Sequence, residues 1–211
     1  PDDEMLIRAY LSYYDKFDPQ PLYLNKAEEL LKSAKDKESA IHLYFIKKNY
    51  SAIVETAKEM DLAEISQPFT AYRIAEAYEQ KGDLAQSEIF FRKAIELEPD
   101  RFEFRDELGN LYLRQGNSAK AKASFSESIK WYPFNPKSYN NLAYCFILEA
   151  NYTAAKRNLD KALELDHQYG PALENFALLY LELNQLEKAK EYLKEAEKYV
   201  KDKERLKRVM K

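Results

Sequence analysis

Small, apolar and aromatic residues recur along this chain in columns spaced 34 residues apart. One column holds large apolar residues, a second aromatic residues and a third small residues. In that order they are Ile74, Leu108, Leu142 and Phe176; Tyr78, Tyr112, Phe146 and Tyr180; and Ala94, Ser128, Ala162 and Ala196. Agreement of several columns at one spacing predicts an architecture built from repeated units.

Each repeat contains two helical segments, because its apolar and small residues recur at helical intervals on both sides of a turn. In the first clear repeat these residues are Ile74, Ala75 and Tyr78, followed by Ser87, Phe91 and Ala94. Gly82 is suited to ending the first helix in the left-handed conformation, and Asp83 to capping the next helix. Pro99 then stops the second helix, because proline lacks an N–H and clashes with the preceding turn. The pattern predicts two antiparallel helices joined by a short turn.

This pattern resembles the tetratricopeptide repeat family over four units, residues 68–101, 102–135, 136–169 and 170–203. The resemblance implies an all-α fold, a right-handed solenoid of stacked antiparallel helix pairs with one 34-residue helix-turn-helix per repeat. It also implies a concave face, lined by the first helix of each pair, that binds extended or helical peptides.

The remaining segments fit the same plan more loosely, and we expect residues 1–211 to form a single helical-repeat domain. Residues 34–67 are interpreted as a degenerate repeat and residues 1–33 as a further helical pair. The last two repeats carry Ala150 and Asn184 at the glycine position, and His167 and Lys201 at the proline position. Without a proline to stop it, the final helix is expected to continue as a basic capping helix over residues 187–211.

Charge and composition exclude several classes of function. Lys and Arg number 33 against 36 Asp and Glu, a net charge of −3, which argues against a nucleic-acid binder. The longest apolar run, residues 142–148, is far short of the roughly 18 residues that a membrane span needs. One cysteine and two histidines do not make a disulfide or the usual zinc frameworks, and four glycines are few for phosphate-binding loops. No cofactor and no metal is expected.

Two arrangements of potentially catalytic residues have simpler structural explanations. Cys145 and His167 could form a nucleophilic pair, but the apolar surroundings of Cys145 favour a buried structural thiol. Glu103, Asp106 and Glu107 could mimic a hydrolase dyad, but a solvated helix face is the favoured interpretation. We therefore expect no catalytic residues and no enzyme activity.

The chain begins at Pro1 and shows no secretion signal, so we expect a soluble fragment or processed form. The composition favours the cytoplasm slightly over the periplasm or secretion and leaves the compartment open.

The family register places a set of residues on the concave face, where a protein or peptide ligand is expected. In the first two clear repeats they are Tyr72, Glu76, Asp106 and Asn110, and in the last two Asn140, Tyr144, Ile147, Leu148, Glu174, Leu178 and Leu181. The first group is polar and mainly acidic, whereas the second contains an apolar strip, and an exposed apolar strip often marks a binding surface. These residues predict a ligand with an apolar anchor and basic flanks.

One ligand class of the family is rejected on the same register. Its carboxylate clamp, which holds the acidic C-terminus of a heat-shock chaperone, needs three cationic residues. This chain offers Asp106, Asn110, Asn141, Pro171 and Asn175 at the five clamp positions of the last three repeats. Asn110 and Asn141 match the two asparagine positions, but Asp106, Pro171 and Asn175 stand where the clamp needs cations, so a carboxylate would not be held. The alternative to an interaction module is a structural repeat that contacts its own parent chain or a second copy in a homo-oligomer.

Overall fold

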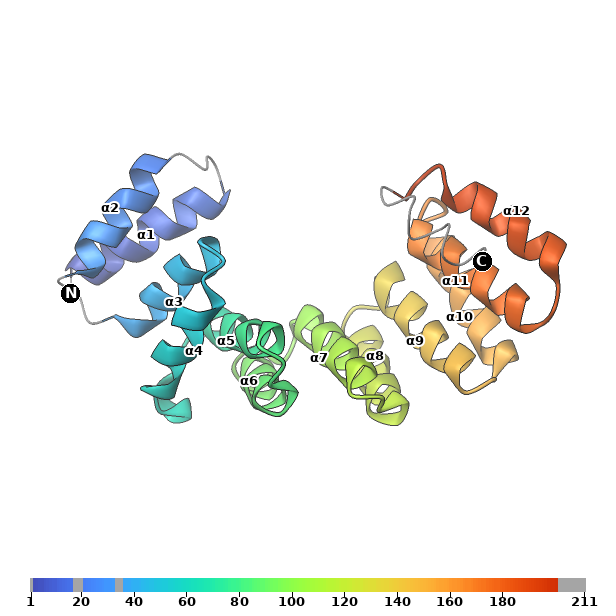
Figure 1. Ribbon diagram of the computed structural model, residues 1–211, viewed down its shortest axis with the longest axis horizontal. Helices are drawn as coiled ribbons and strands as arrows, with labels where there is room; N and C mark the ends of the chain where they lie inside the picture. Colours follow the sequence, from blue (N-terminus) through green and yellow to red (C-terminus); the bar gives the residue numbers. More distant parts are fainter. Residues whose placement is uncertain (1, 17–20, 33–35, 201–211) are drawn as a thin grey trace. The chain divides into compact units, whose positions relative to one another are not determined.

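The computed structural model describes residues 2–16, 21–32 and 36–200, and within them it contains helices and no strands. The predicted all-α solenoid fold is confirmed, since consecutive antiparallel helix pairs follow one another in chain order (Figure 1). The chain divides into two compact units, residues 1–100 and 101–211, where the sequence predicts a single domain. In a repeat protein each pair contacts only its neighbours, so the chain has no single shared core.

Unit 1 contains three helix pairs and a short 3-10 helix in the connection before the third pair. The helices are α1 (Asp2–Lys16), α2 (Pro21–Leu31), α3 (Lys37–Ile46), α4 (Tyr50–Lys58), η1 (Leu62–Glu64), α5 (Pro68–Gln80) and α6 (Leu84–Leu97). Ile7, Leu11 and Ala27 of the first pair share a buried cluster with Leu43 of α3. The N-terminal pair is therefore joined to the next pair by a continuous apolar contact.

Unit 2 contains three further pairs. They are α7 (Phe102–Arg114) with α8 (Ser118–Trp131), α9 (Pro136–Leu148) with α10 (Tyr152–Leu165), and α11 (Gly170–Glu182) with α12 (Leu186–Ala196). The small side chains of the sequence columns lie at the helix crossings. Ala143, Ala162 and Ala177 are completely buried, and Phe176 fills the space beside them. Small residues thus let neighbouring helix backbones approach closely.

The turns inside the five pairs from α3–α4 to α11–α12 share one backbone conformation. Lys48, Gly82, Gly116, Ala150 and Asn184, each 34 residues after the last, have φ values of 53°, 80°, 73°, 54° and 57°. The next residue caps the second helix when it is Asp or Asn, as Asn151 does for the amide of Ala154 at 3.2 Å. Left-handed backbone costs an L-residue free energy, so Ala150 occupies this position against its intrinsic preference.

The expected long C-terminal helix is wrong within the described residues, because α12 ends at Ala196. The chain turns there, and Val200 contacts the apolar cluster of Leu173, Ala177 and Leu193. Gly170 makes room for it, since a Cβ atom at that position would lie 2.6 Å from Val200 Cγ2. Burial of Val200 against α11 therefore ends the helix without a proline. Residues 201–211 of the expected helix lie outside the described residues.

Replacing Ala150 by glycine should stabilise the chain by about 0.5–1 kcal/mol, because glycine adopts positive φ without steric cost. The midpoint of urea denaturation measures this change in the free energy of unfolding, provided that the slope of the transition is the same in both proteins. Ala123→Gly is the control, since it places glycine at an exposed position inside α8 and should cost up to about 1 kcal/mol. A lower midpoint for Ala150→Gly would show that the turn is not left-handed in solution.

Candidate functional site

The first helices α7, α9 and α11 of unit 2 lie side by side and form one face, here called the first-helix face. A row of asparagine side chains crosses it. Asn175 Nδ2 donates to Asn140 Oδ1 at 2.9 Å, and Asn140 Nδ2 donates to Asn141 Oδ1 at 3.2 Å. Asn141 Nδ2 then donates to Asn110 Oδ1 at 3.3 Å, so the row connects all three helices. We call these four residues the asparagine row.

The asparagine row ends at an ion pair between α7 and α9. Asn110 Nδ2 donates to Glu107 Oε2 at 3.0 Å, and Lys137 Nζ lies 2.6 Å from Glu107 Oε1. Both oxygens of this carboxylate therefore accept hydrogen bonds from the chain itself. This neutralises the charge that the sequence assigns to this part of the face.

A pocket of about 240 Å³ opens at the other end of the row, between α9 and α11. Asparagine amides and apolar side chains line it together: Asn140, Asn141, Tyr144, Pro171, Glu174, Asn175 and Leu178. Tyr144 and Leu178 are half-buried, whereas Asn140 and Glu174 are each only 5% exposed. The pocket therefore offers apolar contact area beside amide donors and acceptors.

The structure places the predicted site residues in several different environments. Asn140, Tyr144, Glu174 and Leu178 meet in the pocket, and Leu181 is half-buried elsewhere on α11. Ile147 is 6% exposed and belongs to the core between α9, α10 and α11, so its assignment to an exposed strip is wrong. Leu148 is 56% exposed at the end of α9, outside the pocket lining. Of the predicted apolar strip, Ile147 is therefore removed, and Tyr144 and Leu178 are the members that line the pocket.

Tyr72 and Glu76 lie in unit 1, where the Tyr72 hydroxyl donates to Glu76 Oε1 at 2.8 Å.

The sequence register places Asp106 on the ligand face, and this prediction is wrong because the residue is only 1% exposed. Its carboxylate accepts a hydrogen bond from Ser138 Oγ at 2.9 Å and one from Asn135 Nδ2 at 2.9 Å. Burial raises the pKa of this carboxyl above its ordinary value, and the Ser128 and Ser138 hydroxyls offset part of that effect. Asp106 therefore joins α7 to α9 and is removed from any ligand surface.

Three pocket residues, Asn141, Pro171 and Asn175, are absent from the predicted groove although the clamp comparison includes them. Asn141 and Asn175 occupy the same column, 34 residues apart, and a repeated polar residue in a helix column was the available signal. The hydrogen bonds that join the row run between helices, so no local spacing reveals them.

Catalytic and metal chemistry find little support in the described part of the chain. Cys145 is completely buried, and burial raises the pKa of its thiol to about 12, so the nucleophilic thiolate is strongly disfavoured. Among residues 2–16, 21–32 and 36–200, no group of three or more His, Cys, Asp or Glu side chains is arranged to hold a metal ion. No helix of these segments combines the length and apolar character needed to cross a membrane.

Sequence comparison assigns the family. Four profiles described as tetratricopeptide repeat match residues 70–101, 90–123, 107–169 and 146–211. The chain belongs to the tetratricopeptide repeat family. A curated relative, Hsp70-Hsp90 organizing protein 1 of Glycine max, is 24% identical over 171 residues, which are 81% of this chain and 26% of the relative. The chain thus spans about a quarter of that relative's length.

Solved structures of the family share the fold. A structure titled "Functional Characterization of Pseudomonas Aeruginosa pilF" has a TM-score of 0.73 and 15% identity, covering 99% of this chain and 96% of the other. A structure of MamA, titled "MamA AMB-1 P212121", has a TM-score of 0.64 and 17% identity, covering 78% of this chain and 97% of the other. Both likenesses show that the fold is shared.

Asp106→Asn should change the pH dependence of stability. The raised pKa means that the folded state binds the proton more tightly than the unfolded state. The contribution of Asp106 to stability is therefore fully present below the ordinary value of 3.8 and is lost as pH rises through the raised folded value. Asparagine cannot ionise, so the stability of the variant relative to the parent should rise between about pH 3.5 and pH 7.

Urea denaturation at both pH values checks this, with Asp3→Asn on the exposed surface of α1 as the control. A pH-independent difference between Asp106→Asn and the parent would contradict the raised pKa.

Cys145 should not react with a disulfide reagent such as DTNB at about pH 8 while the chain is folded, because the thiol is buried and protonated. It should react fully in urea. Ala123→Cys supplies the positive control, an exposed thiol on α8 that reacts in the folded chain. Rapid labelling of Cys145 in the native parent would contradict its placement in the core.

Proposed function

We propose that this chain is a non-catalytic interaction scaffold whose first-helix face in unit 2 binds a peptide or helix of a partner protein. The observation that carries the proposal is the asparagine row, which leads into the pocket beside Tyr144 and Leu178. The row supplies hydrogen bonds and the pocket supplies apolar contact. Together they suit a polypeptide ligand, which offers backbone amides and side chains side by side.

The asparagine row retains capacity for a ligand. Each amide oxygen has two lone pairs, and Asn110, Asn140 and Asn141 each use one of them for a bond within the row. The second lone pair of Asn110 and of Asn141, which are half-buried, can accept a backbone N–H from a ligand. Because the row is held by its own hydrogen bonds, its side chains are ordered before a ligand arrives, which lowers the entropic cost of binding.

The pocket is suited to one side chain of a larger ligand. Its volume of about 240 Å³ is below the roughly 300–1,000 Å³ of sites that enclose whole small molecules. Tyr144 and Leu178 supply apolar walls, so an aliphatic or aromatic side chain is the expected anchor. The asparagines around the pocket would bind the backbone on either side of that anchor.

The basic flanks expected from the sequence are not carried into this proposal. The carboxylates that motivated them are engaged within the chain, since Asp106 accepts hydrogen bonds from Ser138 and Asn135, and Glu76 accepts one from Tyr72. A basic ligand would have to break those bonds to gain its own.

A chaperone C-terminus is not the proposed ligand, although one relative is named an Hsp70-Hsp90 organizing protein. The clamp positions of this chain hold Asp106 and Pro171 where the clamp needs cations, and Asp106 is buried. What the relative supports is the broader role of a scaffold that holds other proteins.

Photo-crosslinking tests the proposal directly. Benzoylphenylalanine in place of Tyr144 should crosslink to one defined segment of a partner protein, with an apolar residue at the crosslinked position. The same substitution at Tyr72, on α5 of unit 1, is the matched control and should not yield that product. Crosslinks from position 144 to a second copy of the chain would favour the homo-oligomer alternative instead.

The variant Leu178→Glu with Tyr144→Ala should abolish capture of the crosslinked partner. Leu178 contacts the buried cluster of unit 2, so circular dichroism must show that the variant stays folded. Asn175→Ala is a milder second variant, which removes one end of the asparagine row and should weaken binding about tenfold. Unchanged capture by both folded variants would contradict the proposal.

A further inference from the structure

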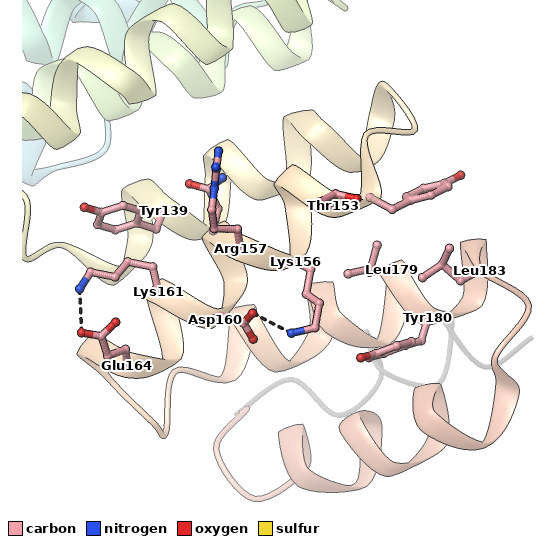
Figure 2. A pocket seen from close by; sticks show the side chains of 12 residues that line it. Tyr139, Thr153, Lys156, Arg157, Asp160, Lys161, Glu164, Leu179, Tyr180 and Leu183 are labelled. Carbon is pink, nitrogen blue, oxygen red and sulfur yellow. Dashed lines mark hydrogen bonds and ion pairs between the residues drawn. The ribbon is translucent and has the colours of Figure 1, made fainter.

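A second hollow in unit 2 runs along α10, the second helix of its pair, and is bordered by α9 and α11. It encloses about 800 Å³, within the range of ligand-binding clefts. Leu179, Tyr180 and Leu183 gather at one end beside Lys156, while Tyr139 and the Lys161–Glu164 ion pair lie at the other end (Figure 2). We call it the second-helix groove. It shares no lining residue with the pocket of the first-helix face.

In the preceding repeat, a bridge of side chains spans the equivalent position. Glu149 follows α9 and reaches two residues of α8. Ser118 Oγ donates to Glu149 Oε1 at 2.9 Å, and Lys122 Nζ lies 2.5 Å from Glu149 Oε2. Lys122 also stands over the Phe146 ring, 5.3 Å from its centroid. These contacts bridge the second helix of one repeat to the first helix of the next.

One repeat later, two of the three residues that form this bridge are different. Moving forward by 34 residues exchanges Ser118 for Tyr152 and Glu149 for Leu183, while Lys122 is matched by Lys156. Position 183 therefore offers Lys156 no carboxylate, and the lysine pairs within its own helix, with Asp160 at 2.7 Å. The apolar end of the second-helix groove therefore has Leu183 where the preceding repeat has its bridging carboxylate.

The lining of the groove carries one more positive than negative charge, with Lys156, Arg157 and Lys161 against Asp160 and Glu164. Lys156 pairs with Asp160 and Lys161 with Glu164, whereas Arg157 forms no ion pair with any residue that the structure describes. The Lys156 side chain is 53% exposed, so it can be reached from solvent.

We propose that the second-helix groove docks a segment of a partner protein that carries a carboxylate next to an apolar side chain. The carboxylate takes the position that Glu149 occupies one repeat earlier and binds Lys156. The Asp160 pair need not break for this, because a lysine ammonium has three N–H donors. The apolar side chain packs against Tyr152, Tyr180 and Leu183. The excess of one positive charge in the lining of the groove selects an acidic segment over a basic one. This surface is separate from the first-helix face, so the chain could hold two partners at once.

Leu183→Glu provides the test, because it restores the bridge of the preceding repeat. The introduced carboxylate should pair with Lys156, fill the groove and repel an incoming carboxylate without unfolding the chain. A library of displayed random peptides is selected on the parent chain, and each enriched peptide is then measured on Leu183→Glu. Peptides that lose binding to the variant should carry Asp or Glu within a few positions of an aliphatic or aromatic residue.

Two further variants separate charge recognition from a general loss of structure. Lys156→Gln should weaken those peptides about tenfold, since a charge-assisted hydrogen bond is lost. Lys190→Gln, at the equivalent position of the last repeat, should leave their affinity unchanged. Leu62→Glu, which introduces the same charge at a 38% exposed leucine in unit 1, controls for the added negative charge.

Three results would overturn the inference. The first is enrichment only of peptides that bind Leu183→Glu as well as the parent. The second is a set of groove-dependent peptides without acidic residues. The third is a parent chain that dimerises in sedimentation while Leu183→Glu stays monomeric, which would make a second copy the occupant. Peptides that depend on Tyr144 but not on Leu183 bind the first-helix face, and enrichment of such peptides alone is an instance of the first result.

Discussion

Close contact between helix backbones at small side chains is the constraint on which the rest of this structure depends. Ala143, Ala155, Ala162 and Ala177 are completely buried at the crossings between helices of unit 2. At Gly109 the space is tighter still, since a Cβ atom would lie 2.5 Å from the Phe125 ring. A larger residue in these columns would force the helices apart, and the loss would extend to both neighbouring repeats.

Because the crossings repeat every 34 residues, the outer faces of the helices are free to differ between repeats. The first-helix face uses this freedom for polar recognition. Asn140 is almost buried, so its amide requires hydrogen-bond partners, and Asn175 and Asn141 provide them from neighbouring positions. At the second-helix groove the same freedom replaces a polar contact by an apolar one, because Leu183 stands where the preceding repeat has the bridging Glu149.

The places where sequence reasoning failed have a common cause. Ile147 and Asp106 follow the register of the exposed face, yet one enters the core and the other is buried under Ser138 and Asn135. The register gives the direction of a side chain relative to its own helix. It does not give the position of the neighbouring helix, and that position decides whether the side chain meets solvent. The end of α12 at Ala196 has the same origin, since it depends on the contact of Val200 with α11.

The sequence by itself determined the helix pairs, their 34-residue step and the buried small columns, because these follow from periodicity and turn chemistry within one repeat. Part of the pocket could also be predicted from the sequence, since Asn140 and Tyr144 share one face of α9, and Glu174 and Leu178 share one face of α11. Only the tertiary structure decided that the asparagines join into one row, that Asp106 is buried and that the second-helix groove is open. Each of these depends on side chains about one repeat apart in sequence, such as Asn110 and Asn141, whose contact exists only after consecutive repeats have stacked.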